Sequence, residues 1–255
     1  MKTLLLLLGL SLSLTIMAKD KRGHQYFQIK VYHIKPAQES GLDTYLQQAY
    51  LPAAHRAGIA QVGVFKPITQ DTADVKVYVF MAFNNLEQYA ALPGRLEKDA
   101  AYQASAGTFM QGYNESAPYN RIETILLTAF EQMPMMALPA LQTPKNERVY
   151  ELRSYESATE GYHINKVKMF NAGGEVQIFK RLGFNAVFYG SVIAGSKTPN
   201  LMYMTTFNNK ADRDTHWKSF SADPEWKKLA ATPEYAHNVS HQDIIFVRPT
   251  EYSDI

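Results

Sequence analysis

The chain has 255 residues, with 26 Lys or Arg, 24 Asp or Glu and no Cys, so its net charge is +2. A near-neutral chain lacks the basic surface that binds a phosphate backbone, and we expect no nucleic acid partner. The absence of cysteine excludes disulfides, thiolate metal sites and cysteine nucleophiles, so stability must come from buried side chains.

The first 18 residues have the pattern of a secretory signal peptide. Lys2 precedes a thirteen-residue, almost wholly apolar run over 4–16, and Ala18 precedes the charged segment 19–22. The run is too short to span a membrane as a helix. We therefore expect a secreted or periplasmic protein with no membrane contact after cleavage of the signal peptide. An uncleaved N-terminal anchor is the alternative interpretation.

The rest of the chain contains one internal repeat, offset by 123 to 125 residues. The segment 26–32 (YFQIKVY) aligns with 149–155 (VYELRSY), and 83–85 (FNN) aligns with 207–209 (FNN). This period is too long for a solenoid unit, and each copy is long enough to bury its own core. We expect a divergent first repeat over 19–132, a Met/Pro-rich linker over 133–147 and a second repeat over 148–255.

Each repeat is predicted to run strand, helix, strand, strand, helix, strand. Period-two alternation predicts strands, and apolar residues at i, i+3, i+4 and i+7 predict the helix from Leu42 to Ala53. Gly173 and Gly174 should break the matching helix of the second copy. Asp223-Pro224 and Thr232-Pro233 predict two short helices near the end. The predicted strands with clear bounds cover 26–34, 62–67, 75–83, 122–130, 187–193 and 243–248.

This element order is the ferredoxin-like βαββαβ plan, and the fold class is α+β. Helices on one face of each sheet would leave the other face open, so we expect the two sheets to pack face to face as a barrel-like dimeric α/β unit within one chain. We expect the even-numbered face of the first opening strand, which is partly polar, to line the barrel interior.

Ionisable groups in an enclosed interior must pair with each other or bind a ligand, because an unpaired buried charge is costly. This argument gives a set of candidate ligand-binding residues. An ion pair between Glu151 and Arg153 that serves only the structure is the alternative. The candidates are Gln28, Lys30, Tyr32, Tyr78, Glu151, Arg153, Tyr155 and Tyr189.

Histidines supply the candidate general bases. His163 and His216 could act as bases if they lie at the mouth of the barrel, although histidines are more often solvated or satisfied structural residues. His237 and His241 are four residues apart but precede a strand and do not share a helix face, so we expect no metal site. We also expect no cofactor.

The second repeat resembles a NIPSNAP domain. The resemblance rests on 149–155 (VYELRSY), 180–184 (KRLGF), 216–220 (HWKSF) and 223–226 (DPEW), and it spans nearly all of 148–248. In the first repeat Gln28 replaces the Glu of the second copy, and 86–102 has no tryptophan. The resemblance implies a dimeric α/β barrel similar in fold to cofactor-free monooxygenases, haem-degrading enzymes and binding proteins, and fold alone does not choose among them.

Three hypotheses about function remain open at this point. The leading hypothesis is that the barrel interior binds a small, partly apolar molecule, with Lys30, Arg153 and tyrosines holding a polar or anionic group. The second is a cofactor-free monooxygenase or haem-processing enzyme that uses the same interior. The third is a structural or interaction protein. The sequence decides neither whether the chain is an enzyme nor whether it forms a homodimer.

Overall fold

The computed structural model describes residues 23–113 and 116–255. The predicted signal peptide, residues 1–18, lies outside the described residues. In the described part of the chain, no helix has the length and apolar character needed to cross a membrane.

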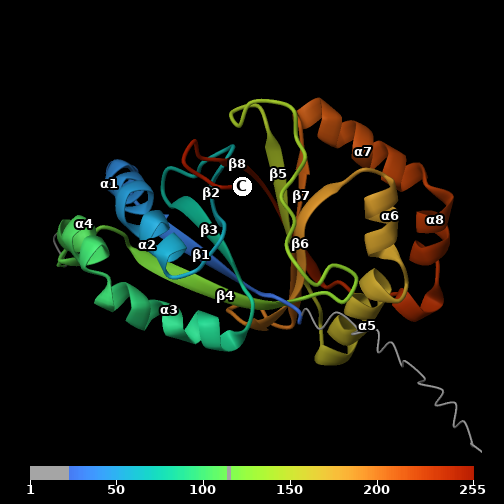
Figure 1. The fold of residues 1–255 in the computed structure, drawn as a ribbon. Helices are drawn as coiled ribbons and strands as arrows, with labels where there is room; N and C mark the ends of the chain where they lie inside the picture. The colour runs from blue at the N-terminus through green and yellow to red at the C-terminus, as the bar shows by residue number, and fades with distance from the viewer. Residues whose placement is uncertain (1–22, 114–115) are drawn as a thin grey trace, which may run out of the picture.

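Antiparallel strands close into a barrel at the centre of the molecule (Figure 1). Their order around the barrel is β1-β3-β2-β8-β5-β7-β6-β4. The strands of the first half are β1 (Tyr26–Ile34), β2 (Val62–Pro67), β3 (Val75–Phe83) and β4 (Arg121–Ala129). Those of the second half are β5 (Val149–Glu156), β6 (Asn185–Ala194), β7 (Asn200–Phe207) and β8 (His241–Pro249).

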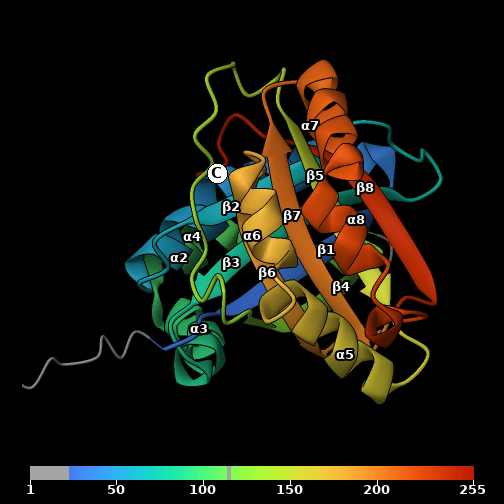
Figure 2. The same cartoon turned by 90° about the vertical axis from the view of Figure 1, so that its right-hand side faces the viewer.

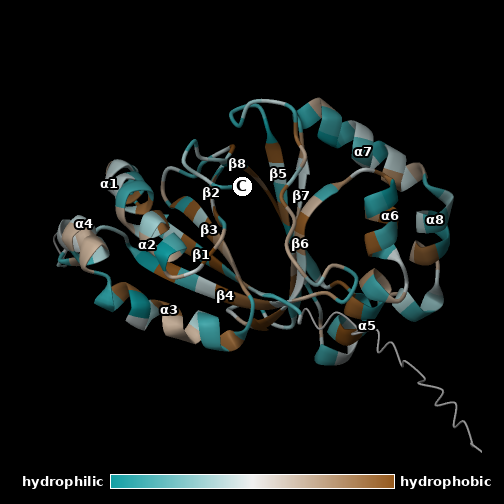
Figure 3. Ribbon diagram, in the orientation of Figure 1, coloured by the Kyte–Doolittle hydropathy of each residue, from teal (hydrophilic) through white to brown (hydrophobic). Residues whose placement is uncertain are grey.

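The helices cover the outside of the barrel, one group on each half (Figures 1 and 2). The first half carries η1 (Pro36–Gln38), α1 (Glu39–Tyr45), η2 (Leu46–Tyr50), α2 (Leu51–Arg56), α3 (Leu86–Lys98) and α4 (Ala100–Met110). The second half carries α5 (Glu160–Asn171), α6 (Glu175–Arg181), α7 (Lys210–Ala222), α8 (Pro224–Ala230) and η4 (Pro233–Tyr235). The strands are largely hydrophobic and the outward helix surfaces are mostly hydrophilic (Figure 3).

The two halves have equivalent sheets, ordered β4-β1-β3-β2 and β8-β5-β7-β6. Two seams join them: Phe65 of β2 pairs with Pro249 of β8, and Leu127 of β4 pairs with Val192 of β6. The sheets therefore close on each other within one chain, which confirms the predicted fold class of two ferredoxin-like units forming a dimeric α/β barrel.

The predicted helix punctuation is also observed. Gly174 separates α5 from α6 and has φ +91°. This backbone conformation is strained for a residue with a Cβ atom but not for glycine. The Asp223 side chain accepts a hydrogen bond from the Trp226 amide, and α8 begins at Pro224.

The faces of the two opening strands, β1 and β5, are opposite to the prediction. The odd-numbered Phe27, Ile29 and Val31 point into the barrel, where Phe27 meets Phe80 and Phe188 at centroid distances of 5.5 and 5.3 Å. The even-numbered side chains of β1 pack under the helices. Alternation identifies two faces of a strand but not which one each layer covers, and a shift of one residue exchanges them. The interior is the drier, more apolar face.

The ends of the barrel differ. The C-terminal segment runs beside β2, with the Thr250 amide bonded to Val64 O and the Asp254 amide bonded to Val62 O, and Ile255 is 3% exposed within the interior core. This segment closes one end. At the other end, charged side chains surround a cavity of about 370 Å³ whose floor includes Leu152 and Met202.

Candidate functional site

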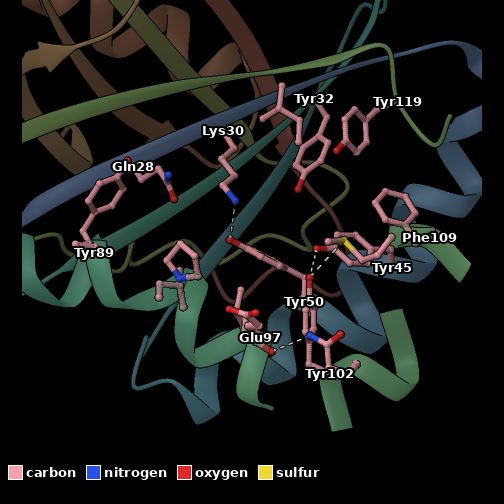
Figure 4. Close-up of a pocket in the computed structure, with 17 residues that line it drawn as sticks. Gln28, Lys30, Tyr32, Tyr45, Tyr50, Tyr89, Glu97, Tyr102, Phe109 and Tyr119 are labelled. Atoms are coloured by element: carbon pink, nitrogen blue, oxygen red, sulfur yellow. Dashed lines mark hydrogen bonds between the residues drawn. The ribbon is translucent and has the colours of Figure 1, made fainter. Parts of the chain in front are cut away.

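The first half contains a cavity of about 540 Å³ between the outer face of its sheet and its helices (Figure 4). We call it the tyrosine cavity, because six tyrosines from the strand, the helices and the segment before β4 line it: Tyr32, Tyr45, Tyr50, Tyr89, Tyr102 and Tyr119. Its volume lies within the usual range of small-molecule sites.

Strand β1 supplies the polar floor of this cavity. Gln28, Lys30 and Tyr32 alternate along the strand and so share the face that points to the helices. Gln28 is only 5% exposed, and its Oε1 has no hydrogen-bond partner among the described residues. A buried acceptor without a partner costs free energy that a donor on a ligand or a water molecule would recover.

Lys30 is the cation of the tyrosine cavity. Its Nζ donates a hydrogen bond to Tyr50 Oη at 3.1 Å and lies 5.0 Å from the centre of the Tyr50 ring. It forms no ion pair with any carboxylate in 23–113 or 116–255. Burial lowers the pKa of Lys30, and the surrounding tyrosines oppose that shift.

The walls of the cavity are aromatic. Tyr45 and Tyr102 share a hydrogen bond of 2.8 Å between their hydroxyl groups, and Phe109 stacks on Tyr45 at a centroid distance of 4.0 Å. Burial raises the pKa of Tyr45 and Tyr50, so both phenols stay neutral at physiological pH. Neutral aromatic walls favour a flat, partly apolar occupant.

A π-helical segment, η2, brings Tyr50 to Lys30. It spans Leu46–Tyr50 and joins α1 to α2, in which Pro52 has no amide hydrogen to continue the α-helical ladder. The Tyr50 hydroxyl donates to Met81 Sδ of β3 at 3.8 Å, which leaves its oxygen free to accept from Lys30. Such segments occur often at functional sites because they redirect a side chain.

The equivalent position of the second half holds an ion-pair network. Glu151 is 0% exposed; Arg153 Nε donates to its Oε1 at 2.7 Å, and Arg213 Nε and Trp217 Nε1 donate to its Oε2 at 2.8 and 2.7 Å. Burial would raise the pKa of Glu151, but the two arginines outweigh it and hold the pKa below its usual range. Glu151 and Arg153 thus form the ion pair that the sequence left as the alternative to a ligand site.

Arg153 is satisfied on every side. Its Nη1 donates to Tyr155 Oη at 2.7 Å, Tyr155 is 2.9 Å from Tyr203 Oη, and the guanidinium lies 3.7 Å from the centre of the Trp217 ring. A second buried pair, Lys166 with Glu175 at 2.9 Å, was not anticipated. The position equivalent to the tyrosine cavity is thus filled by the chain's own side chains.

The two remaining predicted ligand-binding residues, Tyr78 and Tyr189, lie in different parts of the molecule. Tyr78 belongs to the barrel interior and lines the cavity at its open end. Tyr189, expected in the interior, lies instead under the helices of the second half, stacked near Phe179 and Tyr203. The expected interior site of eight residues is therefore divided, and Gln28, Lys30 and Tyr32 remain together in the tyrosine cavity.

Neither candidate general base lies at the barrel mouth or in the tyrosine cavity. His163 Nε2 is 2.7 Å from Ser191 Oγ, its Nδ1 is buried without a partner in the described residues, and burial lowers its pKa. His216 Nδ1 bonds to Asp212 O at 2.8 Å, and its ring packs against Phe184 and Phe207.

One group of side chains has the composition of a metal site. Ligand atoms of Glu156, His241 and Asp243 lie within 4.8 Å of one another. Lys197 Nζ already bonds to Asp243 and lies 3.9 Å from Glu156. The lysine thus supplies the positive charge that the carboxylates need.

Five of the cavity tyrosines and Phe109 were not selected from the sequence. Tyr45 and Tyr50 fall in the apolar stripe of 42–53, where the pattern indicated packing on the sheet, and the others lie outside the predicted strands. The available signal was the number of tyrosines in the first half that lie outside predicted strands.

The fold and the site define an α+β barrel made from two ferredoxin-like sheets, with a ligand-sized cavity in one half. Residues 150–254 match the family profile of NIPSNAP, so the second half of the chain is similar to a NIPSNAP domain. Among curated proteins, no significant match to the chain is found.

Solved structures with the same barrel cover most of the chain. A proposed monooxygenase from Lactobacillus acidophilus has a TM-score of 0.58 and 12% identity, covering 89% of this chain and 94% of its own. A proposed monooxygenase from Fusobacterium nucleatum has a TM-score of 0.57 and 8% identity, covering 89% and 93%. A proposed chlorite dismutase has a TM-score of 0.50 and 12% identity, covering 91% and 97%. At these identities the likeness concerns the fold alone.

Proposed function

We propose that the protein is an exported binding protein whose tyrosine cavity holds a small aromatic molecule with an acidic group. The observation that carries this proposal is Lys30, a largely buried cation without a carboxylate partner in the described chain, at the floor of an aromatic cavity. An anionic ligand would supply the missing charge.

The two halves of the chain support this role when equivalent positions are compared. Gln28 and Lys30 align with Glu151 and Arg153. The strand pairings are also equivalent: Lys30 of β1 lies opposite Val79 of β3, and Arg153 of β5 lies opposite Tyr203 of β7. In the second half a carboxylate neutralises the buried cation. In the first half an amide takes its place, and the cation is left to pair with something else.

The shape of the cavity indicates the rest of the ligand. The neutral phenol and phenyl rings suit a flat ring system, and the unpartnered Gln28 Oε1 suits a hydroxyl or N–H donor. Aromatic side chains fill the centre of the barrel, so the ligand is assigned to the tyrosine cavity and not to the barrel interior.

The first test is native mass spectrometry of residues 19–255 purified from the host compartment. An added mass that is lost on denaturation would reveal a bound molecule and its size. A bare mass would not decide between an empty site and a lost ligand, so a direct titration with a defined probe follows.

The titration uses 2-naphthoate as the anionic probe and 2-naphthamide as its neutral counterpart. Lys30→Met and Gln28→Glu should each weaken 2-naphthoate binding by about tenfold or more. The first removes the charge-assisted hydrogen bond to the ligand, and the second adds a carboxylate that repels the ligand and pairs with Lys30. Neither change should weaken 2-naphthamide binding as much. Lys98→Met, at an exposed position outside the cavity, is the matched control. Equal affinity of the wild type and Lys30→Met for 2-naphthoate would contradict the proposal.

A monooxygenase is the second candidate, because two of the structures with the same barrel are described as proposed monooxygenases. The cavity lining contains no histidine in the described chain, and both candidate bases lie in the other half. We therefore rank binding first. Aerobic incubation with the recovered ligand, followed by mass analysis of that ligand, separates the two: oxygen incorporation would establish an enzyme.

A further inference from the structure

We propose that Lys30 forms an imine with the carbonyl carbon of an aromatic aldehyde held in the tyrosine cavity. This inference rests on the proposed function only in using the same cavity. It assigns the cavity a covalent capability that the binding of an aromatic acid does not require.

The first argument is the state of the amine. An exposed lysine, or one paired with a carboxylate, is held as the ammonium ion, which is not a nucleophile. Lys30 is neither exposed nor paired with a carboxylate in the described chain. It is largely buried, its hydrogen-bond partner is the neutral Tyr50 hydroxyl, and Gln28, which aligns with Glu151, has no charge. Desolvation in an apolar pocket is one of the ways in which lysine is activated for imine formation.

Among the described residues, the titratable groups that face Nζ from the packed elements include no carboxylate that would hold the ammonium form. Strand β1 contributes Tyr32, η2 contributes Tyr50, α3 and α4 contribute Tyr89 and Tyr102, and the segment before β4 contributes Tyr119. All of these are phenols. The carboxylate among the described lining residues, Glu97 of α3, is exposed and is not among the groups that shift the lysine pKa.

The reaction balances without an oxidant or reductant. The Nζ lone pair attacks the carbonyl carbon, and the N–C bond forms as the carbonyl π electrons move to oxygen. Nitrogen loses one proton and the oxygen takes one up, which gives the neutral carbinolamine. The hydroxyl then takes up a second proton, the C–O bond breaks and water leaves, while the nitrogen lone pair forms the C=N bond and nitrogen loses its second proton. Amine and aldehyde thus give imine and water.

Tyr50 is placed to assist the proton transfers. Its hydroxyl is 3.1 Å from Nζ, so it reaches the atoms attached to the new C–N bond. Burial raises the pKa of Tyr50 and keeps the phenol protonated, so that it can donate to the departing oxygen. We regard Tyr50 as an assisting group and Lys30 as the nucleophile.

The experiment incubates the folded protein with 2-naphthaldehyde and cyanoborohydride near neutral pH and maps the reduced adducts by peptide mass spectrometry. The adduct should form on Lys30 about tenfold faster than on exposed lysines such as Lys98, because a lysine with a lower pKa has a larger amine fraction. Labelling spread evenly over exposed lysines would overturn the proposal.

Three variants sharpen the result. Lys30→Arg should lose the adduct at position 30 while other lysines react as before. Gln28→Glu should slow the Lys30 adduct by about tenfold, because a carboxylate holds the ammonium form as Glu151 holds Arg153. Tyr50→Phe keeps the lysine and should slow adduct formation. Unchanged rates in both Gln28→Glu and Tyr50→Phe would contradict the assigned mechanism.

Titration with 2-naphthoate on the same samples separates the two proposals. Binding of 2-naphthoate without selective labelling would overturn the imine and leave the acid-binding role standing. Selective labelling of Lys30 without 2-naphthoate binding would support the imine and remove the acid-binding role. Circular dichroism of each variant shows whether a lost signal reflects unfolding.

Discussion

At the scale of single residues, one exchange separates the two halves. Glu151 is the acceptor for two arginines and a tryptophan, whereas Gln28 at the aligned position has no charge and its Oε1 has no partner in the described chain. The surroundings of the two positions differ accordingly. The second half closes around an ion-pair network built on a buried carboxylate, and the first half keeps a cavity around an unpaired cation.

The two cations should therefore respond in opposite directions to the same substitution. Lys30→Met removes an uncompensated buried charge and should raise the free energy of unfolding by about 1 kcal/mol or more. Arg153→Met leaves Glu151 with part of its partners missing and should lower it by about 3 kcal/mol. Urea unfolding followed by tryptophan fluorescence measures both. A destabilising Lys30→Met would show that Lys30 is a structural residue.

The Glu151 network should also give stability a pH dependence with a definite sign. Its pKa is lower in the folded than in the unfolded protein, so its contribution is fully present above the unfolded pKa of about 4.3. The contribution is lost as the pH falls through the lower, folded value. The acid-induced loss of stability should be smaller in Glu151→Gln than in the wild type, measured as the urea midpoint between pH 6 and pH 3. Parallel curves would contradict this assignment.

At the scale of elements, the sequence predicted which helices and strands form, and in what order, better than it predicted which face each strand turns to the barrel. The break at Gly173 and Gly174 and the helix start at Asp223-Pro224 follow from local backbone chemistry, which the sequence carries in full. The face that each strand turns to the barrel depends on the other half of the molecule. Because both faces are buried, the alternation in β1 could not decide it.

The same limit explains which site residues could be predicted. Gln28, Lys30 and Tyr32 were found because polar side chains on a buried strand stand out against its alternation. Tyr50 could not be assigned to the site, because its direction depends on the π-helical segment Leu46–Tyr50. A regular α-helical pattern contains no signal for that extra residue.

At the scale of the whole molecule, the barrel links the two halves. Two strand seams and one shared interior connect them, and Phe80 of the first half stacks on Phe188 of the second at 4.9 Å. Neither sheet has an open edge at these seams, and the apolar interior faces of both would be exposed if the halves separated. The cavity and the ion-pair network thus lie on opposite sides of one common core.

This arrangement predicts that the halves lose stability together. Phe80→Leu removes ring contacts in the interior and should destabilise the protein by about 1 to 3 kcal/mol. Because the interior is shared, hydrogen exchange of amides in β5 should accelerate as much as exchange in β1, although residue 80 belongs to the first half. Tyr89→Leu, at a half-buried position on the outer side of the same half, is the matched control and should leave β5 unaffected. Faster exchange in β1 alone after Phe80→Leu would mean that each half is stable without the barrel, and the seams would then be contacts between independent domains.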